Sequence, residues 1–238
     1  MPSTAYKRIL LKLSGEVLAG NKGFGIDPIK ATQLATEIKS IHEMGVSIGL
    51  IIGAGNIFRG IQAASKGMER VTGDYLGMLS TIINAISLQD ALEKVDVETR
   101  TLSAITVTKI AEPYIRRRAL RHLDKNRIVI VAGGTGNPYF TTDTAAALRA
   151  TELQAEVLLK GTKVNGVYDK DPVVNSDAIH FDEISYSEVL SKNLRVMDLT
   201  AITLCKENSL PIRVFNINES GDLKKVVKGD KIGTLIKK

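Results

Sequence analysis

Cysteine is nearly absent from this sequence, which has one, Cys205, in 238 residues. A single cysteine cannot close an internal disulfide, so the chain is unlike the small disulfide-rich domains of secreted proteins. Cys205 lies in the apolar run AITLCKEN, and we expect a buried, reduced thiol in a reducing compartment. The 3 histidines stand far apart without the spacing of metal ligands, which gives a metal-centred hydrolase little support.

Long hydrophobic runs are missing as well. The apolar stretch near the start is interrupted by Lys12, so it is too short for the core of a signal peptide. No other apolar run approaches the roughly 20 residues that cross a membrane. Proline is scarce, with 6 residues, and 44% hydrophobic against 24% charged residues is typical of a globular chain. We expect one compact, cytoplasmic domain spanning residues 1–238.

Acidic residues are fewer than basic ones, and the formal net charge is +6. A positive chain favours anionic partners, either small phosphorylated ligands or nucleic acid. The densest basic cluster lies in a predicted surface helix and comprises Arg116, Arg117, Arg118 and Arg121. No aromatic residues alternate with these arginines to stack bases, so a solvated helix face is the other interpretation.

The sequence does contain short β-branched runs that alternate with longer helical patterns, which is typical of a mostly parallel sheet. The predicted strands span residues 6–13, 47–52, 98–102, 127–132, 157–160 and 212–216. Several, such as IVIVA and IGLII, are apolar almost throughout, as expected of strands covered on both faces. The sequence therefore predicts an α/β fold, a three-layer α/β/α sandwich around a mostly parallel sheet.

Two helical segments are well marked. The first has Asp27 as a cap, Pro28 in its first turn and Gly45 at its end, so we expect a crossover between the first two strands. The second, residues 74–92, carries apolar residues around most of its circumference. Such a helix needs burial on more than one side, and we therefore expect a homo-oligomer.

Several familiar motifs are absent. No G-x-x-x-x-G-K-[ST] sequence is present, which excludes a Walker-type P-loop, and no G-x-S-x-G elbow indicates a nucleophilic serine. The segment from Gly53 begins like a dinucleotide-binding fingerprint. However, Phe58 occupies the third glycine position, and Asp74 opens a predicted helix instead of ending a strand. A Rossmann dehydrogenase is therefore disfavoured.

Glycine-rich turns follow three of the predicted strands. They are Lys12-Leu13-Ser14-Gly15, Gly53-Ala54-Gly55-Asn56 and Gly133-Gly134-Thr135-Gly136-Asn137-Pro138, and a fourth, polar loop spans residues 160–171. In open α/β sheets such turns present backbone N–H groups to anions at the carboxyl ends of the strands. With Lys12 and Arg59 they indicate phosphoryl transfer, which depends on positioning and charge stabilisation. The alternative is that Lys12 is an ordinary strand-end lysine.

The motifs RILLKLSGE, IIGAGNIFRG, GDYLGMLST, GTGNPYFTTD, NGVYDKDP and RVMDLTA occur together along nearly the whole chain. In this combination the sequence resembles the amino acid kinase superfamily, and within it the bacterial kinases that phosphorylate UMP. The resemblance implies transfer of the γ-phosphoryl group of Mg²⁺-ATP to UMP in pyrimidine nucleotide biosynthesis. It also implies a hexamer, with UMP bound by residues from about 1–155 and ATP by residues from about 156–238.

The resemblance implies two nucleotide sites. For ATP the implied residues are Lys12, Leu13, Ser14, Gly15, Gly55, Arg59, Thr162, Tyr168 and Asp171. For UMP they are Ala54, Asp74, Thr135, Gly136, Asn137, Pro138, Tyr139, Phe140, Thr141 and Thr142. Asp74 would accept hydrogen bonds from ribose hydroxyls, although its position also suits a helix N-cap. Thr141 and Thr142 precede a predicted helix whose free amides suit uracil or phosphate.

Three further implications concern catalysis and regulation. Lys12, Lys160 and Asp198 are the implied catalytic group, in which Asp198 orients the lysine; a cap on the following helix is its alternative role. GTP activation is implied for Gly20, Asn21, Lys22, Gly23, Phe24 and Gly25, and UTP is the implied inhibitor. Relatives commonly have three successive glycines where this chain has Gly53-Ala54-Gly55. Since alanine rarely adopts a positive φ, the loop must differ or the UMP contact must tolerate a β-carbon.

The expected mechanism is direct attack of a UMP phosphate oxygen on the γ-phosphorus. A phosphomonoester has a second pKa of about 6, so near neutral pH the nucleophile is mostly dianionic and no general base is needed. Lys12, Lys160, Arg59, Mg²⁺ and loop amides would compensate the charge of the two polyanions. Two alternatives stay open: a phosphotransferase of the same superfamily that acts on a small acid, and a nucleic-acid-binding regulator.

Overall fold

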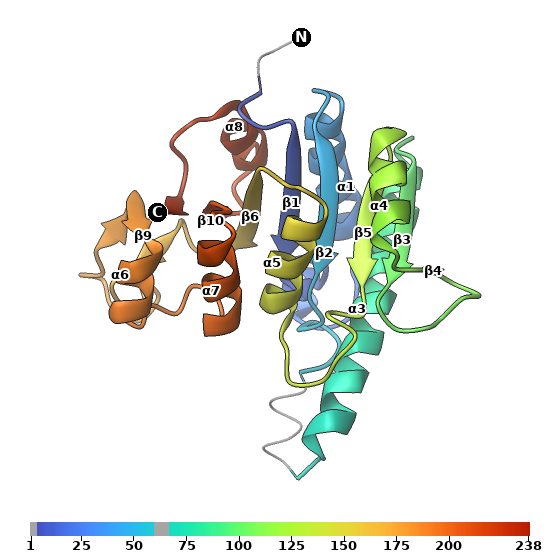
Figure 1. The fold of residues 1–238 in the computed structure, drawn as a ribbon, viewed down its shortest axis with the longest axis horizontal. Coiled ribbons are helices and arrows are strands. Elements are labelled where there is room, and N and C mark those ends of the chain that lie inside the picture. The colour runs from blue at the N-terminus through green and yellow to red at the C-terminus, as the bar shows by residue number, and fades with distance from the viewer. Residues whose placement is uncertain (1–3, 60–66) are drawn as a thin grey trace.

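The structure is a computed structural model that describes residues 4–59 and 67–238. The described residues form a nine-stranded sheet in the order β4-β3-β5-β2-β1-β6-β10-β11-β9 (Figure 1). Its strands are β1 (Arg8–Leu13), β2 (Ser47–Ile52), β3 (Thr99–Ser103), β4 (Glu112–Pro113), β5 (Ile128–Ala132), β6 (Val157–Thr162), β9 (Glu183–Ser185), β10 (Ile212–Asn216) and β11 (Thr234–Lys237). Strands β7 (Val167–Tyr168) and β8 (His180–Phe181) form a separate antiparallel hairpin. All pairs in the large sheet are parallel except β10 with β11, which confirms the predicted, mostly parallel sheet.

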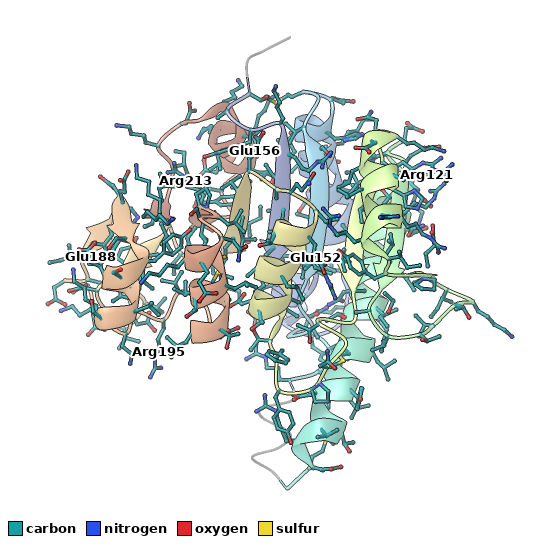
Figure 2. All side chains as sticks on the ribbon, in the orientation of Figure 1. Arg121, Glu152, Glu156, Glu188, Arg195 and Arg213 are labelled. Atoms are coloured by element: carbon teal, nitrogen blue, oxygen red, sulfur yellow. The ribbon has the colours of Figure 1, made fainter. Side chains whose placement is uncertain are left out.

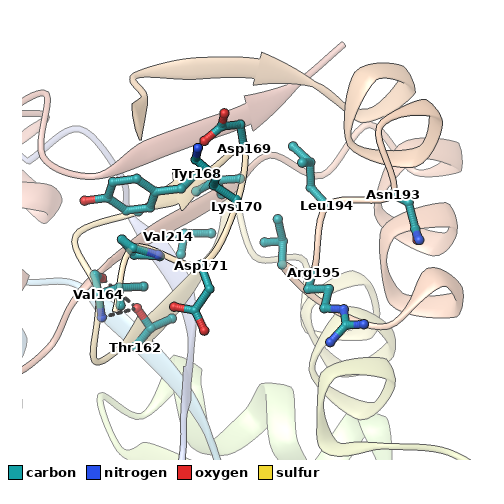
Figure 3. Close-up of a pocket in the computed structure, with 14 residues that line it drawn as sticks. Thr162, Val164, Tyr168, Asp169, Lys170, Asp171, Asn193, Leu194, Arg195 and Val214 are labelled. Atoms are coloured by element: carbon teal, nitrogen blue, oxygen red, sulfur yellow. Dashed lines mark hydrogen bonds between the residues drawn. The ribbon is translucent and has the colours of Figure 1, made fainter. Parts of the chain in front are cut away.

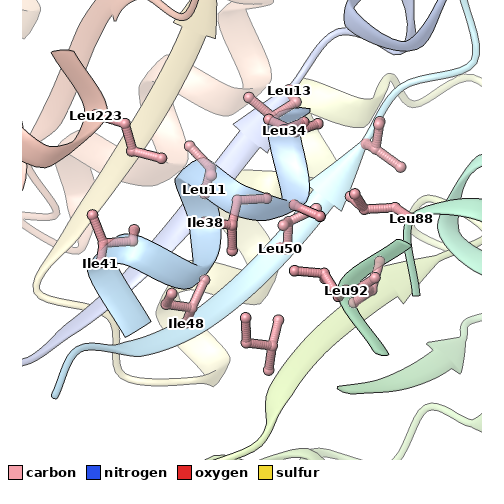
Figure 4. Packing of buried hydrophobic residues seen from close by; sticks show 14 of the residues in the cluster. Leu11, Leu13, Leu34, Ile38, Ile41, Ile48, Leu50, Leu88, Leu92 and Leu223 are labelled. Atoms are coloured by element: carbon pink, nitrogen blue, oxygen red, sulfur yellow. The ribbon is translucent and has the colours of Figure 1, made fainter. Parts of the chain in front are cut away.

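Helices cover one face of the sheet through α1 (Pro28–His42), α3 (Arg70–Glu93) and α8 (Asp222–Lys228). The Asp27 carboxylate accepts a hydrogen bond from the Ile29 amide, and Pro28 follows it in the first turn, as predicted. Alternate strand residues such as Leu11, Leu13 and Leu50 meet these helices in one buried cluster (Figure 4). Burying such side chains supplies most of the favourable free energy of folding.

The opposite face packs against α4 (Arg116–Asp124), α5 (Thr142–Glu152), α6 (Tyr186–Ser191) and α7 (Leu199–Glu207). Here the other strand residues, among them Leu10, Val129 and Leu158, form a second buried cluster with Cys205. Cys205 is fully buried as a free thiol, and burial raises its pKa to about 12, which keeps it protonated. Helices on both faces confirm the three-layer α/β/α sandwich.

The start of α3 differs from the prediction. The helix begins at Arg70, with Glu69 as its cap, so Asp74 lies in the second turn and the expected N-cap role of Asp74 was wrong. The short strands β4, β7, β8, β9 and β11 were also missed, because they have few residues and little alternation to detect. Among residues 4–59 and 67–238, no helix has the length and hydropathy of a membrane span.

Candidate active site

The four predicted loops follow neighbouring strands. Strands β5, β2, β1 and β6 are adjacent and parallel, so their carboxyl ends lie at one edge of the sheet (Figure 1). The Gly53 amide donates to the Leu13 carbonyl at 2.9 Å, which ties the loop after β2 to the end of β1. Main-chain topology alone therefore brings the glycine turns and the loop after β6 together.

Gly15 shows why glycine is needed where two of these loops meet. A β-carbon on Gly15 would lie 2.3 Å from the Asn56 side-chain oxygen and 2.4 Å from the Gly53 carbonyl. No side chain fits at such distances. Gly15 begins the short 3₁₀ helix η1 (Gly15–Leu18), and the Ser14 hydroxyl caps it by accepting from the Glu16 amide.

Lys12 on β1 and Lys160 on β6 are register partners in adjacent strands. Both ammonium groups contact one carboxylate, that of Asp143 in the first turn of α5. Lys12 Nζ lies 2.6 Å from Oδ1, and Lys160 Nζ donates to Oδ2 at 2.8 Å. The Lys12 contact is an ion pair that lowers the pKa of Asp143. Lys160 also donates to the Val196 carbonyl at 2.5 Å, so it is held more firmly than Lys12.

The cluster is buried, and its charges depend on one another. Burial alone would raise the pKa of Asp143, but Lys12 and Lys160 outweigh this effect and lower it to about 2. Burial lowers the pKa of Lys160, and the charge of Asp143 opposes that shift. The carboxylate is therefore ionised near neutral pH, and the three groups carry a net positive charge available to an anion.

Asp198, predicted to orient the lysine, is placed differently. Its carboxylate caps α7 by accepting from the Ala201 amide at 2.9 Å, which agrees with the alternative cap role. It also accepts hydrogen bonds from the hydroxyls of Thr141 and Thr144. Within the described parts of the chain Asp198 forms no ion pair with a lysine, and Asp143 is the carboxylate that contacts both. Asp198 thus fixes the entry to α5, where Asp143 lies.

The first cavity, of about 410 Å³, lies beside the loops after β2 and β5 and against α3. Its lining includes six residues predicted for UMP, which are Ala54, Asp74, Thr135, Phe140, Thr141 and Thr142. Gly55 and Arg59, which were predicted for ATP, line the same cavity, together with Phe58, Arg70, Met78 and Thr81. Asp74 accepts from the Tyr139 amide at 2.7 Å and from Arg70 Nε at 2.8 and 2.9 Å. Since two carboxylate oxygens offer about four acceptor sites, Asp74 retains capacity for a ligand hydroxyl.

The loop from Gly133 to the N-terminus of α5 has an unusual backbone. Gly133, Gly134, Gly136 and Tyr139 all have positive φ values, between 60° and 86°. Tyr139 adopts this conformation without being glycine, and its amide is held by Asp74. Asn137 is tied to the Thr135 hydroxyl, which accepts from its amide at 3.1 Å. Strain of this kind persists where surrounding contacts enforce it, as at binding sites.

The second cavity, of about 480 Å³, lies beside the loop after β6 (Figure 3). It contains the predicted Thr162, Tyr168 and Asp171. Its other lining residues include Val164, Asn193, Leu194, Arg195, Val196 and Val214, which the sequence did not reveal. The Thr162 hydroxyl donates to the Val164 carbonyl at 2.7 Å and closes the turn (Figure 3). An apolar slot with polar groups at its rim suits a flat heterocycle.

The lysine cluster adjoins both cavities through neighbouring residues, although Lys12, Asp143 and Lys160 themselves line neither cavity. The Val196 carbonyl that receives Lys160 belongs to a residue in the lining of the second cavity. Asp143 directly follows Thr142, which lines the first.

Arg59 and the exposed Lys163 contact a different acid, Glu16. Arg59 pairs with one oxygen of the Glu16 carboxylate, and Lys163 lies 2.5 Å from the other. The contact with Lys163 lowers the pKa of Glu16, while burial opposes the shift and Arg59 adds to it. Arg59 lines the first cavity, so this pair of cations on one carboxylate lies at that cavity.

The predicted regulatory segment packs against the loop after β2. The 3₁₀ helix η2 (Gly20–Lys22) is followed by Gly23 and Gly25, both with positive φ. The Gly25 amide donates to the Asn56 carbonyl at 2.8 Å. Residues 20–25 line neither of the two cavities.

Alanine at position 54, where relatives commonly have glycine, needs no strained backbone. None of the three residues has a positive φ, so alanine is accommodated in an ordinary conformation. Ala54 lines the first cavity, and its β-carbon is part of that wall. The altered-loop alternative is therefore unnecessary.

Asp143 is the main residue that sequence reasoning missed. Its one signal was an acidic residue in the first turn of a helix, a position that commonly has a purely local role. Within residues 4–59 and 67–238, no group of three or more His, Cys, Asp or Glu residues could hold a metal ion. Asp143 and Asp198 are already occupied by lysines, hydroxyls and a backbone amide.

Comparison with known proteins agrees with this geometry. A family profile described as the amino acid kinase family matches residues 7–216. A UMP kinase from Bacillus anthracis is 40% identical with a TM-score of 0.94, over 98% of this chain and 96% of that one. A UMP kinase from Ureaplasma parvum is 38% identical with a TM-score of 0.92, over 98% and 99% of the two chains. A uridylate kinase from Archaeoglobus fulgidus is 27% identical with a TM-score of 0.75, over 96% and 99%.

The family match covers residues 7–216, and 98% of this chain superposes on each of the two bacterial UMP kinases. This chain belongs to the amino acid kinase family.

Proposed function

We propose that this chain is a UMP kinase, which transfers the γ-phosphoryl group of Mg²⁺-ATP to UMP and forms ADP and UDP. The observation that carries the proposal is the Lys12–Asp143–Lys160 cluster, which adjoins residues of two cavities of about 410 and 480 Å³ at one edge of the sheet. The similar UMP kinases support UMP as the acceptor.

In the proposed arrangement UMP occupies the first cavity. Asp74 accepts hydrogen bonds from the ribose hydroxyls, and residues 135–142 surround the base and phosphate with backbone amides. ATP occupies the second cavity, with Thr162, Tyr168 and Asp171 near the adenosine. Its phosphates extend to the residues 12–15 loop, Gly55 and Arg59. Residues from about 1–155 thus contribute the UMP site, and those from about 156–238 most of the ATP site.

The chemistry requires little beyond positioning and charge. One oxygen of the UMP phosphate attacks the γ-phosphorus, the bond to the bridging oxygen of ATP breaks, and ADP leaves with that oxygen. Lys12 and Lys160 compensate the charge that gathers between donor and acceptor, an electrostatic contribution that is large in a water-excluded site. Asp143 holds both ammonium groups in place between turnovers. Since Lys160 is also held by the Val196 carbonyl, Lys12 is the lysine that reorients toward the transferred group.

Mg²⁺ enters as part of the substrate Mg²⁺-ATP. Asp143 and Asp198 are engaged by lysines and hydroxyls, and the described residues contain no group of three or more acidic, His or Cys side chains that could hold a metal ion.

We also propose a homo-oligomer assembled through α3, with a hexamer as the form carried by the family resemblance. The helix exposes Tyr75, Leu76, Leu79 and Ile83, four large apolar side chains that a second copy would cover. GTP activation through residues 20–25, UTP inhibition, a cytoplasmic location and a place in pyrimidine nucleotide biosynthesis are proposed on the same resemblance.

A coupled ADP-release assay with UMP, CMP, AMP, glutamate and carbamate as acceptors tests the function. We expect turnover with UMP to exceed the others by about two orders of magnitude, since a polar site rejects ligands that leave its groups unpaired. Preferred turnover of glutamate or carbamate would replace UMP kinase by a small-acid kinase.

The alternative function, a nucleic-acid-binding regulator, depends on the arginines of α4. Arg118 pairs with Glu112, and Arg121 lies on the outside of the molecule (Figure 2). Steeply salt-dependent DNA binding without kinase turnover would favour the regulator.

A further inference from the structure

Asn56 and Asn84 form a reciprocal pair of side-chain amides beneath the candidate active site. Asn56 Nδ2 donates to Asn84 Oδ1 at 3.0 Å, and Asn84 Nδ2 donates to Asn56 Oδ1 at 2.7 Å. Asn56 lies in the loop after β2, and Asn84 lies on α3. Their exposed fractions are 1% and 0%, so the pair is sealed from solvent.

Each amide uses its remaining hydrogen on a loop carbonyl. Asn84 Nδ2 donates to the Gly53 carbonyl at 2.7 Å, and Asn56 Nδ2 donates to the Gly25 carbonyl at 2.7 Å. All four N–H groups of the pair are therefore satisfied, and a flipped amide would place oxygen against oxygen. A buried polar network that is fully satisfied rigidifies the structure around it.

The pair joins three loops at their closest approach. Besides Gly53 and Gly25, it packs on Gly15, where an added β-carbon would meet the side chains of Asn56 and Asn84 at 2.3 and 2.9 Å. The Gly25 amide in turn donates to the Asn56 carbonyl. The loop after β1, the loop after β2 and the end of the 20–25 segment thus share one support.

Asn84 lies on a face of α3 that also contacts the loop after β5, which is part of the proposed UMP site. Thr81, three residues earlier and therefore on the same face, accepts a hydrogen bond from the Gly133 amide at 2.8 Å. Asp74, seven residues before Thr81, holds the Tyr139 amide. One helix face therefore contacts the loop after β5 through Asp74 and Thr81, and the loop after β2 through Asn84.

We propose that Asn84, acting with Asn56, is a positioning residue that couples acceptor binding on α3 to the phosphate-facing loops. The inference rests on the proposed function and adds a residue pair that touches neither substrate. A ligand that contacts Asp74 and the loop after β5 favours one position of α3. Because Asn84 lies on α3, this position also sets where Gly53 lies and, through Asn56, where Gly25 lies. Acceptor and donor sites are thereby aligned by one buried contact.

Three substitutions on α3 separate this role from general packing. Asn84→Leu keeps the number and branching of the side-chain heavy atoms but removes both donations, so Gly53 and Asn56 lose buried partners. Thr81→Val removes the acceptor of the Gly133 amide and a donation to the Met78 carbonyl within α3, and it leaves the Asn56–Asn84 pair intact. Gln89→Met is the matched control, because Gln89 also accepts from a backbone amide, that of Thr101, but at strand β3 and away from the cavities.

For Asn84→Leu we expect higher KM values for both UMP and ATP and a kcat lowered about tenfold or more, as for a lost alignment contact. Thr81→Val should raise the KM for UMP while leaving that for ATP within about twofold, and Gln89→Met should leave both unchanged. Asn56→Leu should reproduce Asn84→Leu, and the double variant should be no worse than either single, since the pair acts as a unit. An Asn84→Leu enzyme with kcat and both KM values of the parent would overturn the proposal, as would a purely UMP-specific loss.

Hydrogen exchange on the unaltered protein tests the same coupling without relying on a variant that folds. UMP alone should slow exchange in residues 133–142 and also at the amides of residues 25 and 53–57. Protection confined to residues 133–142 would refute the coupling while leaving UMP binding intact. Absence of protection at residues 133–142 would instead count against UMP as the ligand, which separates failure of the proposed function from failure of this inference.

Discussion

Lys12 and Lys160 stand opposite each other as register partners on adjacent parallel strands, and one carboxylate, Asp143, contacts both. Two ammonium groups this close repel each other, and the buried carboxylate offsets that repulsion. The arrangement leaves a net positive charge at the carboxyl edge of the sheet, where phosphate groups would collect. This local charge, more than the overall charge of +6, accounts for a preference for polyanions.

Lys12→Met should lower kcat by about two orders of magnitude or more, because its charge acts mainly on the transition state. Folding should persist, since Lys160 still pairs with Asp143. The measurement is steady-state turnover together with the thermal midpoint of unfolding. Lys39→Met, which removes a partly exposed ammonium on α1, serves as the control. Turnover of the Lys12 variant within a few-fold of the parent would remove this residue from the mechanism.

Asp74→Asn should raise the KM for UMP much more than the KM for ATP. The amide loses one acceptor oxygen, so Asp74 can no longer serve Arg70, the Tyr139 amide and ribose hydroxyls together. Asp90→Asn on the same helix alters an exposed ion pair with Lys94 and should change neither constant. Equal increases for both substrates would assign Asp74 a structural role only. Initial rates measured over a matrix of both substrate concentrations decide between these outcomes.

Asp143→Asn should destabilise the protein in a pH-dependent manner. The pKa of Asp143 in the folded protein, about 2, lies below the ordinary aspartate value of 3.8 that applies to the unfolded chain. The ionised carboxylate therefore stabilises the fold at pH values above 3.8, and this contribution is lost as the pH falls toward 2. The gap in thermal midpoint between parent and variant should be widest near neutral pH and should narrow across that acidic window. The surface variant Asp124→Asn, which breaks the pair with Arg8, should show a much smaller difference in thermal midpoint from the parent. If the difference for Asp143→Asn did not depend on pH, Asp143 would not be the ionised, stabilising carboxylate described here.

Leu79→Glu combined with Ile83→Glu should lower the molecular mass of the particle in solution. Both side chains are about half exposed on α3, at 44% and 50%, and a charge there would be buried without a partner in an assembly. Sedimentation or light scattering of parent and variant measures the change. Ile29→Glu alters an equally apolar, exposed position on α1 and should leave the mass unchanged. An unaltered mass in the α3 variant would place any interface elsewhere.

The predicted strands and loops agree with the structure where local pattern is strong. Strands at 47–52 and 212–216 were placed at their observed bounds, because continuous apolar runs leave few alternatives for a buried strand. The start of α3 was missed by four residues, since the turn before Asp74 lacks apolar periodicity. Short strands such as β11 and the edge strand β9 depend on their neighbours for definition, and no local signal marks them.

The sequence by itself determined the layers of this protein and the edge at which its loops gather. Parallel strands joined by helical crossovers place all their carboxyl ends together, so glycine turns after β1, β2 and β5 must meet. Only the tertiary structure decided which side chains meet within that edge. Asp143 pairs with lysines on two strands, and Asn84 pairs with Asn56, because contacts between residues remote in the chain depend on the packing of α5 and α3 against the sheet, which no local pattern encodes.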